Sequence, residues 1–367
     1  MKVAINRRAL LAAGALLAAS ARFPAFAKVR SQDISPENAA RIRALIARMT
    51  LAEKLGQMTQ LAGGRQKSLN SRIDDAALET VRQGRVGSYL HVAGAEPLAK
   101  LQRVAVEESR LRIPLLFAMD VVHGYRTIMP VPLGLAASFD PDLVRSAAHV
   151  AAVEASVSGL HWTFAPMIDV ARDARWGRVV EGAGEDPYLG ARIAEAQILG
   201  FQSDTLAGRD VVMACAKHFG AYGAGAGGRD YDSADVSDAT LHEVYLPPFQ
   251  AAIAAGSGSM MTAFNALNGV PTTGNADLVR RLLREDWGYQ GLVVSDWNAI
   301  LELVAHGAAT SPVEAAALAL RAGVDMDMTS STYADHLDAA VAADASLLPL
   351  VDEAVGRILH AKARLGL

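Results

Sequence analysis

The sequence alternates between short apolar runs and longer amphipathic stretches along most of its length. The apolar runs have the composition of strands buried on both faces, and the stretches between them show the apolar spacing of helices. The predicted strands are Gln57–Leu61, Val86–Val92, Leu115–Asp120, His161–Asp169, Val211–His218, Ser259–Asn265, Leu292–Asp296 and Val324–Met328. Strict alternation with helices predicts a parallel α/β sheet, and eight strands predict a closed (β/α)8 barrel, the TIM-barrel fold.

The helices are expected between the strands, with several starts marked by capping residues. Thr50 and Glu53 have the spacing of a capping box. Asp186 directly precedes Pro187 and is predicted to be a helix N-cap, so Asp186 and its neighbour Glu185 are interpreted as structural. The predicted helices are Pro36–Met49, Ala95–Ser109, Pro141–Ser158, Pro187–Phe201, Asp238–Ala255, Ala276–Glu285, Pro312–Ala322 and Pro349–Leu365.

The N-terminus has the pattern of an export signal. Lys2, Arg7 and Arg8 precede the apolar run Ala9–Ala19, and Ala25-Phe26-Ala27 offers small residues to a signal peptidase. The run is too short to span a bilayer. We expect a cleaved signal peptide over residues 1–27, by the general or the twin-arginine route, and one barrel domain over residues 28–367 in the periplasm or outside a bacterial cell.

The composition is that of an ordinary globular protein. The chain is 51% hydrophobic and 20% charged with a formal net charge of -4. This balance provides no electrostatic basis for binding nucleic acid or an anionic membrane. Cys215 is the single cysteine and lies in an apolar run, so we interpret it as a small buried hydrophobe.

Polar residues recur at the C-terminal ends of the predicted strands. The carboxyl ends of parallel barrel strands meet at one face, so side chains placed there should converge. Asp296 follows the apolar run Leu292–Val294 and is the first candidate for a catalytic group, with Trp297 beside it as an aromatic platform. The other residues in this position are Asp120, Asp169, Lys217, His218, Phe264 and Asn265. Two long loops follow the same strand ends, at 171–186 and 220–237, and loops of this size are usually functional.

Four segments resemble sequence hallmarks of glycoside hydrolase family 3. They are Asp173–Arg178 with its continuation to Pro187, Lys217–Phe219, Asn265–Pro271 and Val294–Trp297. The resemblance extends from about Leu51 to the C-terminus. Gly227–Tyr231 is similar to the periplasmic β-glucosidase and β-xylosidase branch.

The resemblance implies a retaining exo-β-glycosidase, of β-glucosidase type, that acts on β-glucoside or β-xyloside oligosaccharides without a metal or an organic cofactor. It implies that Asp296 is the nucleophile. It further implies a sugar site built from Asp120, Arg178, Lys217, His218, Arg229, Tyr231, Phe264 and Trp297. At Phe264 many members carry a tyrosine whose hydroxyl bonds near the nucleophile, a contact that phenylalanine lacks.

The same resemblance raises the question of the proton donor. A retaining glycosidase needs a second carboxyl group roughly 5 to 5.5 Å from the first. In most members this is a glutamate on an α/β-sandwich domain after the barrel, and in a minority it is a histidine in the loop after the Lys-His pair. Residues 220–237 contain no histidine. We expect a barrel that lacks its own general acid, as a truncated gene product, a fragment, or one half of a two-chain enzyme whose second domain or chain supplies the glutamate.

Two other interpretations remain open from the sequence. Lys217 could form a Schiff base, or Asp120, His123 and His218 could bind a metal, in a different class of barrel enzyme. Alternatively, the barrel could bind sugar without catalysis.

Overall fold

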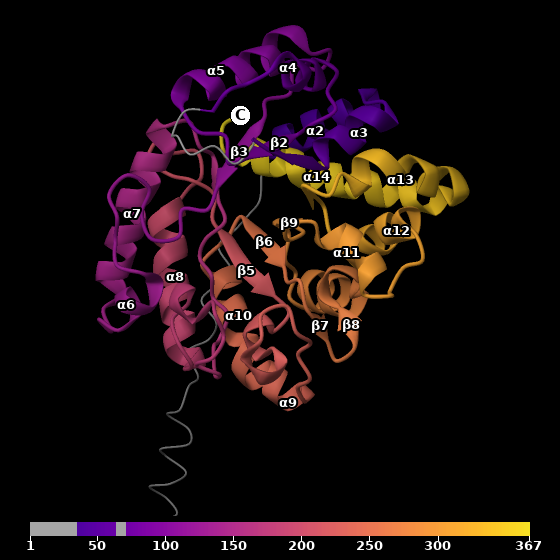
Figure 1. The fold of residues 1–367 in the computed structure, drawn as a ribbon. Coiled ribbons are helices and arrows are strands. Elements are labelled where there is room, and N and C mark those ends of the chain that lie inside the picture. Colours follow the sequence, from indigo (N-terminus) through magenta and orange to yellow (C-terminus); the bar gives the residue numbers. More distant parts are fainter. Residues whose placement is uncertain (1–34, 64–70) are drawn as a thin grey trace, which may run out of the picture.

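A closed barrel of parallel strands forms the centre of the computed structural model, which describes residues 35–63 and 71–367 (Figure 1). The predicted signal peptide lies outside the described residues. The barrel strands are β1 (Thr59–Ala62), β2 (Ser88–Leu90), β3 (Leu116–Met119), β4 (Trp162–Thr163), β5 (Cys215–Phe219), β6 (Ser259–Thr262), β9 (Leu292–Val294) and β10 (Asp327–Met328). Six of these strands lie entirely within strands predicted from the sequence, and β1 and β5 extend one residue beyond theirs.

The hydrogen-bonded order of the strands closes the sheet. One group runs β10-β1-β2-β3-β4 and a second runs β5-β6-β9, with every pair parallel. Parallel bridges at Trp162–Met213 and Met167–Lys217 join the first group to the second, and a bridge at Val294–Met326 joins β9 to the start of β10. The prediction of a (β/α)8 barrel is therefore confirmed.

Helices surround the strands, as Figure 1 shows. They are α2 (Pro36–Arg48), α3 (Leu51–Gln57), α4 (Asp75–Arg82), α5 (Ala95–Arg103), α6 (Pro132–Ala136), α7 (Pro141–Val157), α8 (Pro187–Gln202), α9 (Asp238–Thr240), α10 (Pro247–Ala254), α11 (Ala299–Ala305), α12 (Pro312–Ala322), α13 (Thr332–Ala343) and α14 (Leu348–Arg364). Single-turn 3₁₀ segments occur at Val179–Glu181, Tyr222–Ala224, Ala226–Gly228, Thr272–Gly274 and Ala345–Leu347.

Two capping predictions are confirmed. Thr50 accepts a hydrogen bond from the Glu53 N–H, and the Glu53 carboxylate accepts one from the Thr50 N–H at 2.9 Å. Asp186 accepts from the N–H of Leu189 at 2.7 Å at the start of α8. Each contact satisfies an N–H group that the first turn of a helix leaves unpaired.

Three predicted helices contain π-helical segments, at Val104–Glu108, Leu241–Tyr245 and Asp277–Asp286. The sequence analysis also did not anticipate α4, α6, α11 and α13, or the hairpin of β7 (Ala266–Leu267) and β8 (Val270–Pro271). The hairpin turn is formed by Asn268 and Gly269, both with positive φ, which is the turn chemistry that an Asn-Gly pair favours. In the described part of the chain, the helices are all too short or too polar to cross a membrane.

Candidate active site

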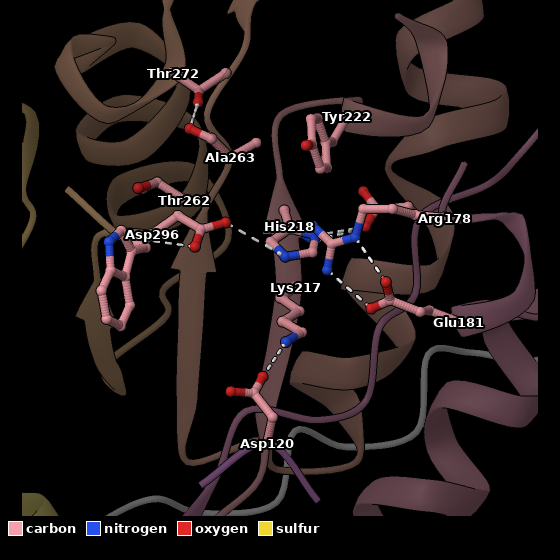
Figure 2. A network of polar contacts seen from close by, with 12 residues as sticks. Asp120, Arg178, Glu181, Lys217, His218, Tyr222, Thr262, Ala263, Thr272 and Asp296 are labelled. Atoms are coloured by element: carbon pink, nitrogen blue, oxygen red, sulfur yellow. Dashed lines mark hydrogen bonds and ion pairs between the residues drawn. The ribbon is translucent and has the colours of Figure 1, made fainter. Parts of the chain in front are cut away.

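The C-terminal ends of the barrel strands bring four of the predicted site residues into one chain of contacts (Figure 2). The ammonium of Lys217 lies 2.7 Å from the Asp120 carboxylate, and Nε2 of His218 lies 3.4 Å from Oδ2 of Asp296. Lys217 and His218 are consecutive residues of β5, joined by a cis peptide bond. The convergence expected from the strand-end positions is thus present.

Asp296 occupies the turn between β9 and α11. The carbonyl of Asp296 accepts from the N–H of Ala299, and the turn passes through Asn298 with φ 61°, a left-handed conformation that asparagine tolerates well. The side chain is buried, and its Oδ1 accepts from the N–H of Trp297 at 2.6 Å. The turn therefore holds the carboxylate at the end of the strand, facing the neighbouring strand ends.

Burial sets the charge state of Asp296. It raises the pKa of this carboxyl to about 7, while the nearby Lys217 and Arg178 act in the opposite direction. These cations favour the ionised form, but desolvation outweighs them.

Asp120 is held between two cationic or potentially cationic groups. Its Oδ1 pairs with Lys217, and its Oδ2 lies 2.9 Å from Nε2 of His91. Burial alone would raise the pKa of Asp120, but Lys217 and His91 together hold it below its usual range. His91 was absent from the predicted site, although it lies at the end of a predicted strand and could have been found by the same rule that selected Asp120.

His218 is buried and has a carboxylate on each side of its ring. Oδ2 of Asp169 lies 2.8 Å from Nδ1 of His218 and also accepts from the His218 backbone N–H at 3.0 Å. Burial raises the pKa of Asp169 to about 7 and lowers that of His218 well below its usual value. Asp169 was noted among the strand-end residues, and the structure places it within this cluster.

Arg178 approaches from the loop after β4. Its guanidinium forms two hydrogen bonds with the Glu181 carboxylate, both 2.8 Å long, and lies 5.4 Å from the centre of the Tyr222 ring. Burial lowers the pKa of Arg178, but Glu181 outweighs it and the pKa lies above its usual range. Tyr222 packs edge-on against His218 and donates to Asp230 at 2.6 Å.

Aromatic side chains border the polar residues. The rings of Tyr231 and Phe264 are 4.4 Å apart, with Tyr231 52% exposed and Phe264 buried. Trp297 is 38% exposed beside Asp296. The side chain of Arg229 is 80% exposed, and its ion pair is with Asp232 rather than with the residues around Asp296.

The residues considered for a metal or a Schiff base have other partners. Nδ1 of His123 bonds the carbonyl of Met129 at 3.0 Å, directing that nitrogen away from Asp120 and His218. Over residues 35–63 and 71–367, no group of three histidine, cysteine or carboxylate side chains is arranged as a metal site. Pairing with Asp120 raises the pKa of Lys217 against the opposing effect of burial, which disfavours the neutral amine that a Schiff base requires.

Comparison with known proteins identifies relatives of the barrel. Residues 50–361 match the model of the glycosyl hydrolase family 3 N-terminal domain. The chain is 41% identical over 323 residues to a periplasmic beta-glucosidase of Salmonella typhimurium, covering 88% of this chain and 42% of that protein. It is 34% identical to a putative beta-xylosidase of Formosa agariphila, covering 89% and 46%.

A solved structure agrees with these relatives. The beta-glucosidase from Listeria innocua in complex with isofagomine superimposes with a TM-score of 0.83 at 39% identity, covering 91% of this chain and 46% of that one. The chain therefore spans about half the length of the relatives that it matches. The match over most of the chain, together with the barrel, shows that the protein belongs to glycoside hydrolase family 3.

Proposed function

We propose that this chain forms the sugar-binding half of a retaining exo-β-glycosidase that removes terminal β-D-glucosyl residues through a covalent glycosyl-aspartate intermediate. The observation that carries the proposal is the position of Asp296, a buried carboxylate at a strand end beside His218 and within the field of Lys217. The names of the relatives, beta-glucosidases and beta-xylosidases, support the same class of substrate.

In this mechanism Asp296 attacks the anomeric carbon as the glycosidic bond breaks, and the leaving oxygen takes a proton from a general acid. Water then attacks the same carbon and releases Asp296, with the general acid acting as base. Neither step requires a metal or an organic cofactor.

The charged residues around Asp296 suit the recognition of sugar hydroxyls. Asp120 remains 37% exposed on its side chain, so it can accept bonds from vicinal hydroxyls in addition to that from Lys217. Lys217 has three N–H donors and Arg178 five, so each retains donors beyond its protein partner. Both ring nitrogens of His218 face carboxylates, so His218 supports Asp296 rather than binding a hydroxyl. Trp297 and Tyr231 supply apolar surface, with Phe264 packed against the Tyr231 ring, and Arg229 contributes from the loop.

We further propose that the general acid, a glutamate, comes from a second domain or chain. The acids near Asp296 are engaged with cations or with His218. Asp120 binds Lys217, Glu181 binds Arg178, and Asp169 binds His218. For Asp120 and Glu181, pairing with a cation favours the ionised form and makes the carboxylate a poor proton donor. Asp169 lies on the Nδ1 side of His218, with the imidazole ring between it and Asp296.

Residues 1–27 are proposed to direct the protein to the periplasm.

The test is hydrolysis of aryl β-glucosides and β-xylosides of graded leaving-group ability by the purified chain. Wild type should act best on the most activated aryl glucoside, because loss of a general acid costs on the order of 10² to 10⁴ in rate and least where the leaving group needs no proton. Asp296→Asn should abolish this activity. Binding of glucose with no turnover on any substrate would instead indicate a non-catalytic sugar-binding barrel.

A further inference from the structure

Asp169, His218 and Asp296 form a linear array across one imidazole ring. Oδ2 of Asp169 lies 2.8 Å from Nδ1, and Oδ2 of Asp296 lies 3.4 Å from Nε2. All three side chains are buried, and within the described residues Oδ1 of Asp169 and Oδ2 of Asp296 lack a hydrogen-bond partner. Each of the two carboxylates therefore has one buried oxygen that no donor in the described residues satisfies.

The backbone identifies the proton on Nδ1. Oδ2 of Asp169 accepts from the His218 backbone N–H at 3.0 Å, so this oxygen is already oriented as an acceptor. The same oxygen at 2.8 Å from Nδ1 is best satisfied by an N–H donor on the ring. With Nδ1 protonated, a neutral ring would present a lone pair from Nε2 to the Asp296 carboxylate. A proton must therefore lie between Nε2 and Asp296, or the two groups repel.

The surrounding charges favour retention of that proton. Lys217 and Arg178 supply two positive charges, whereas Asp120, Glu181, Asp169 and Asp296 would supply four negative charges if all were ionised. Tyr222 faces the ring edge-on and directs its hydroxyl to Asp230, so it adds no charge. Burial raises the pKa values of both Asp169 and Asp296 to about 7. Burial, Arg178 and Lys217 lower the pKa of His218, so a charged ring at this position requires an ionised carboxylate against it, and Asp169 is the carboxylate at Nδ1.

We propose that Asp169 is a positioning residue that fixes the Nδ1–H form of His218 and draws the shared proton onto Nε2, so that Asp296 is ionised while the array still holds this proton. The inference rests on the proposed role of Asp296 as nucleophile. An ionised Asp169 stabilises the imidazolium, as a buried carboxylate does in other Asp–His pairs. The proton then stays on Nε2–H, donated toward the Asp296 carboxylate, and no bond is made or broken until Asp296 attacks the sugar.

The test is the pH profile of kcat/KM for an activated aryl β-glucoside with wild type, Asp169→Asn and Asp173→Asn. In Asp169→Asn the amide oxygen of the new side chain can still accept from the His218 backbone, but without a charge it no longer stabilises the imidazolium, so the shared proton moves to Asp296. The midpoint of the acidic limb should move to a pH about one unit higher or more. At pH 6 kcat/KM should fall about tenfold or more, and part of this loss should be recovered at higher pH. Asp173→Asn removes a half-buried carboxylate that is paired with the exposed Arg175, outside the Asp169–His218–Asp296 array, and should leave the profile unchanged.

A purely structural role for Asp169 would lower kcat/KM equally at all pH values, and that parallel loss would overturn the proposal. A neutron structure of the wild type keeps the proposal testable if Asp169→Asn does not fold. The expected result is a deuteron on Nδ1 of His218 facing Asp169, and a bare Nδ1 would contradict it.

Different results would refute the proposed function and the proposed role of Asp169. Absence of wild-type turnover and of any adduct on Asp296 would refute the proposed function, while the neutron structure would still report the orientation of His218. Normal turnover with an adduct on Asp296, combined with an unshifted acidic limb in Asp169→Asn, would refute only the role of Asp169.

Discussion

Arg178 and Glu181 join through two parallel hydrogen bonds, Nε to Oε1 and Nη2 to Oε2, each 2.8 Å long. Both side chains are largely shielded from water, and the guanidinium also lies over the Tyr222 ring. This pair fixes the position of a cation whose charge favours the ionised forms of Asp169 and Asp296.

Glu181→Gln should therefore destabilise the protein by about 1–3 kcal/mol, because the partly buried Arg178 loses its counter-charge and one of its two acceptors. Chemical denaturation would measure the change. The matched control is Glu195→Gln, since Glu195 pairs with Arg192 at the same sequence spacing on the more exposed surface of α8. The control should change stability by no more than about 0.5 kcal/mol, and equal effects of the two variants would show that burial of the Arg178 pair contributes nothing.

The Tyr231 ring is expected to act as an apolar platform for the substrate. It is half exposed, rests against the buried Phe264 and has a φ of 65°, which is uncommon for an aromatic residue. Tyr231→Ala should raise KM about 3- to 10-fold with a smaller change in kcat, the scale of one lost ring contact. Tyr231→Phe keeps the ring and should retain a KM close to that of wild type. A rise in KM for both variants would assign the effect to the hydroxyl instead.

The sequence pattern predicted the barrel because each strand is an uninterrupted apolar run. The run ending at Val294 is buried on both faces, so a search for alternating apolar and polar residues would not have identified this strand. The sequence also predicted which residues converge, since the strand-end rule depends only on the position of a residue in a parallel strand. The Asn268-Gly269 hairpin was missed although its turn signal is strong, because its strands are only two residues long.

The charge states around Asp296 could not be predicted from sequence. They depend on burial, which raises the pKa of Asp169 and Asp296 by a comparable amount, and the packing around each carboxyl group sets that burial. The strand-end rule could have placed His91 near Asp120, but it does not say which of the converging residues form a hydrogen bond with each other. Pairings of this kind require the three-dimensional arrangement of the strand ends.

Lys362 provides a prediction about stability near the C-terminal end of α14. Its ammonium is fully buried in α14 and donates to Oε1 of Gln57 at 2.6 Å, and burial lowers its pKa to about 7. The folded-state pKa thus lies below that of the unfolded chain, about 10.4. The charged form disfavours folding, so this residue reduces stability as the pH falls from about 10 to about 7.

Lys362→Met should consequently stabilise the protein at pH 7 by about 1–3 kcal/mol, the relief of burying a charge less the cost of leaving Gln57 without its donor. The gain should shrink toward pH 10. Denaturant unfolding at several pH values would measure both features. Lys100→Met, at an exposed position on α5, should leave the pH dependence unaltered. A loss of stability in Lys362→Met at pH 7 would mean that the bond to Gln57 outweighs the cost of burying the charge.

The assignment of Asp296 as nucleophile is tested most directly by trapping with an activated 2-deoxy-2-fluoro-β-glucoside, which slows the release of a glycosyl-enzyme. Intact mass and peptide mapping would be compared for wild type and Asp296→Ala, with Asp173→Asn as a matched acid-removal control. We predict one fluoroglucosyl adduct on wild type and on Asp173→Asn, mapped to the peptide that contains Asp296, and none on Asp296→Ala. An adduct mapped to another carboxylate, or an adduct that persists in Asp296→Ala, would contradict the account.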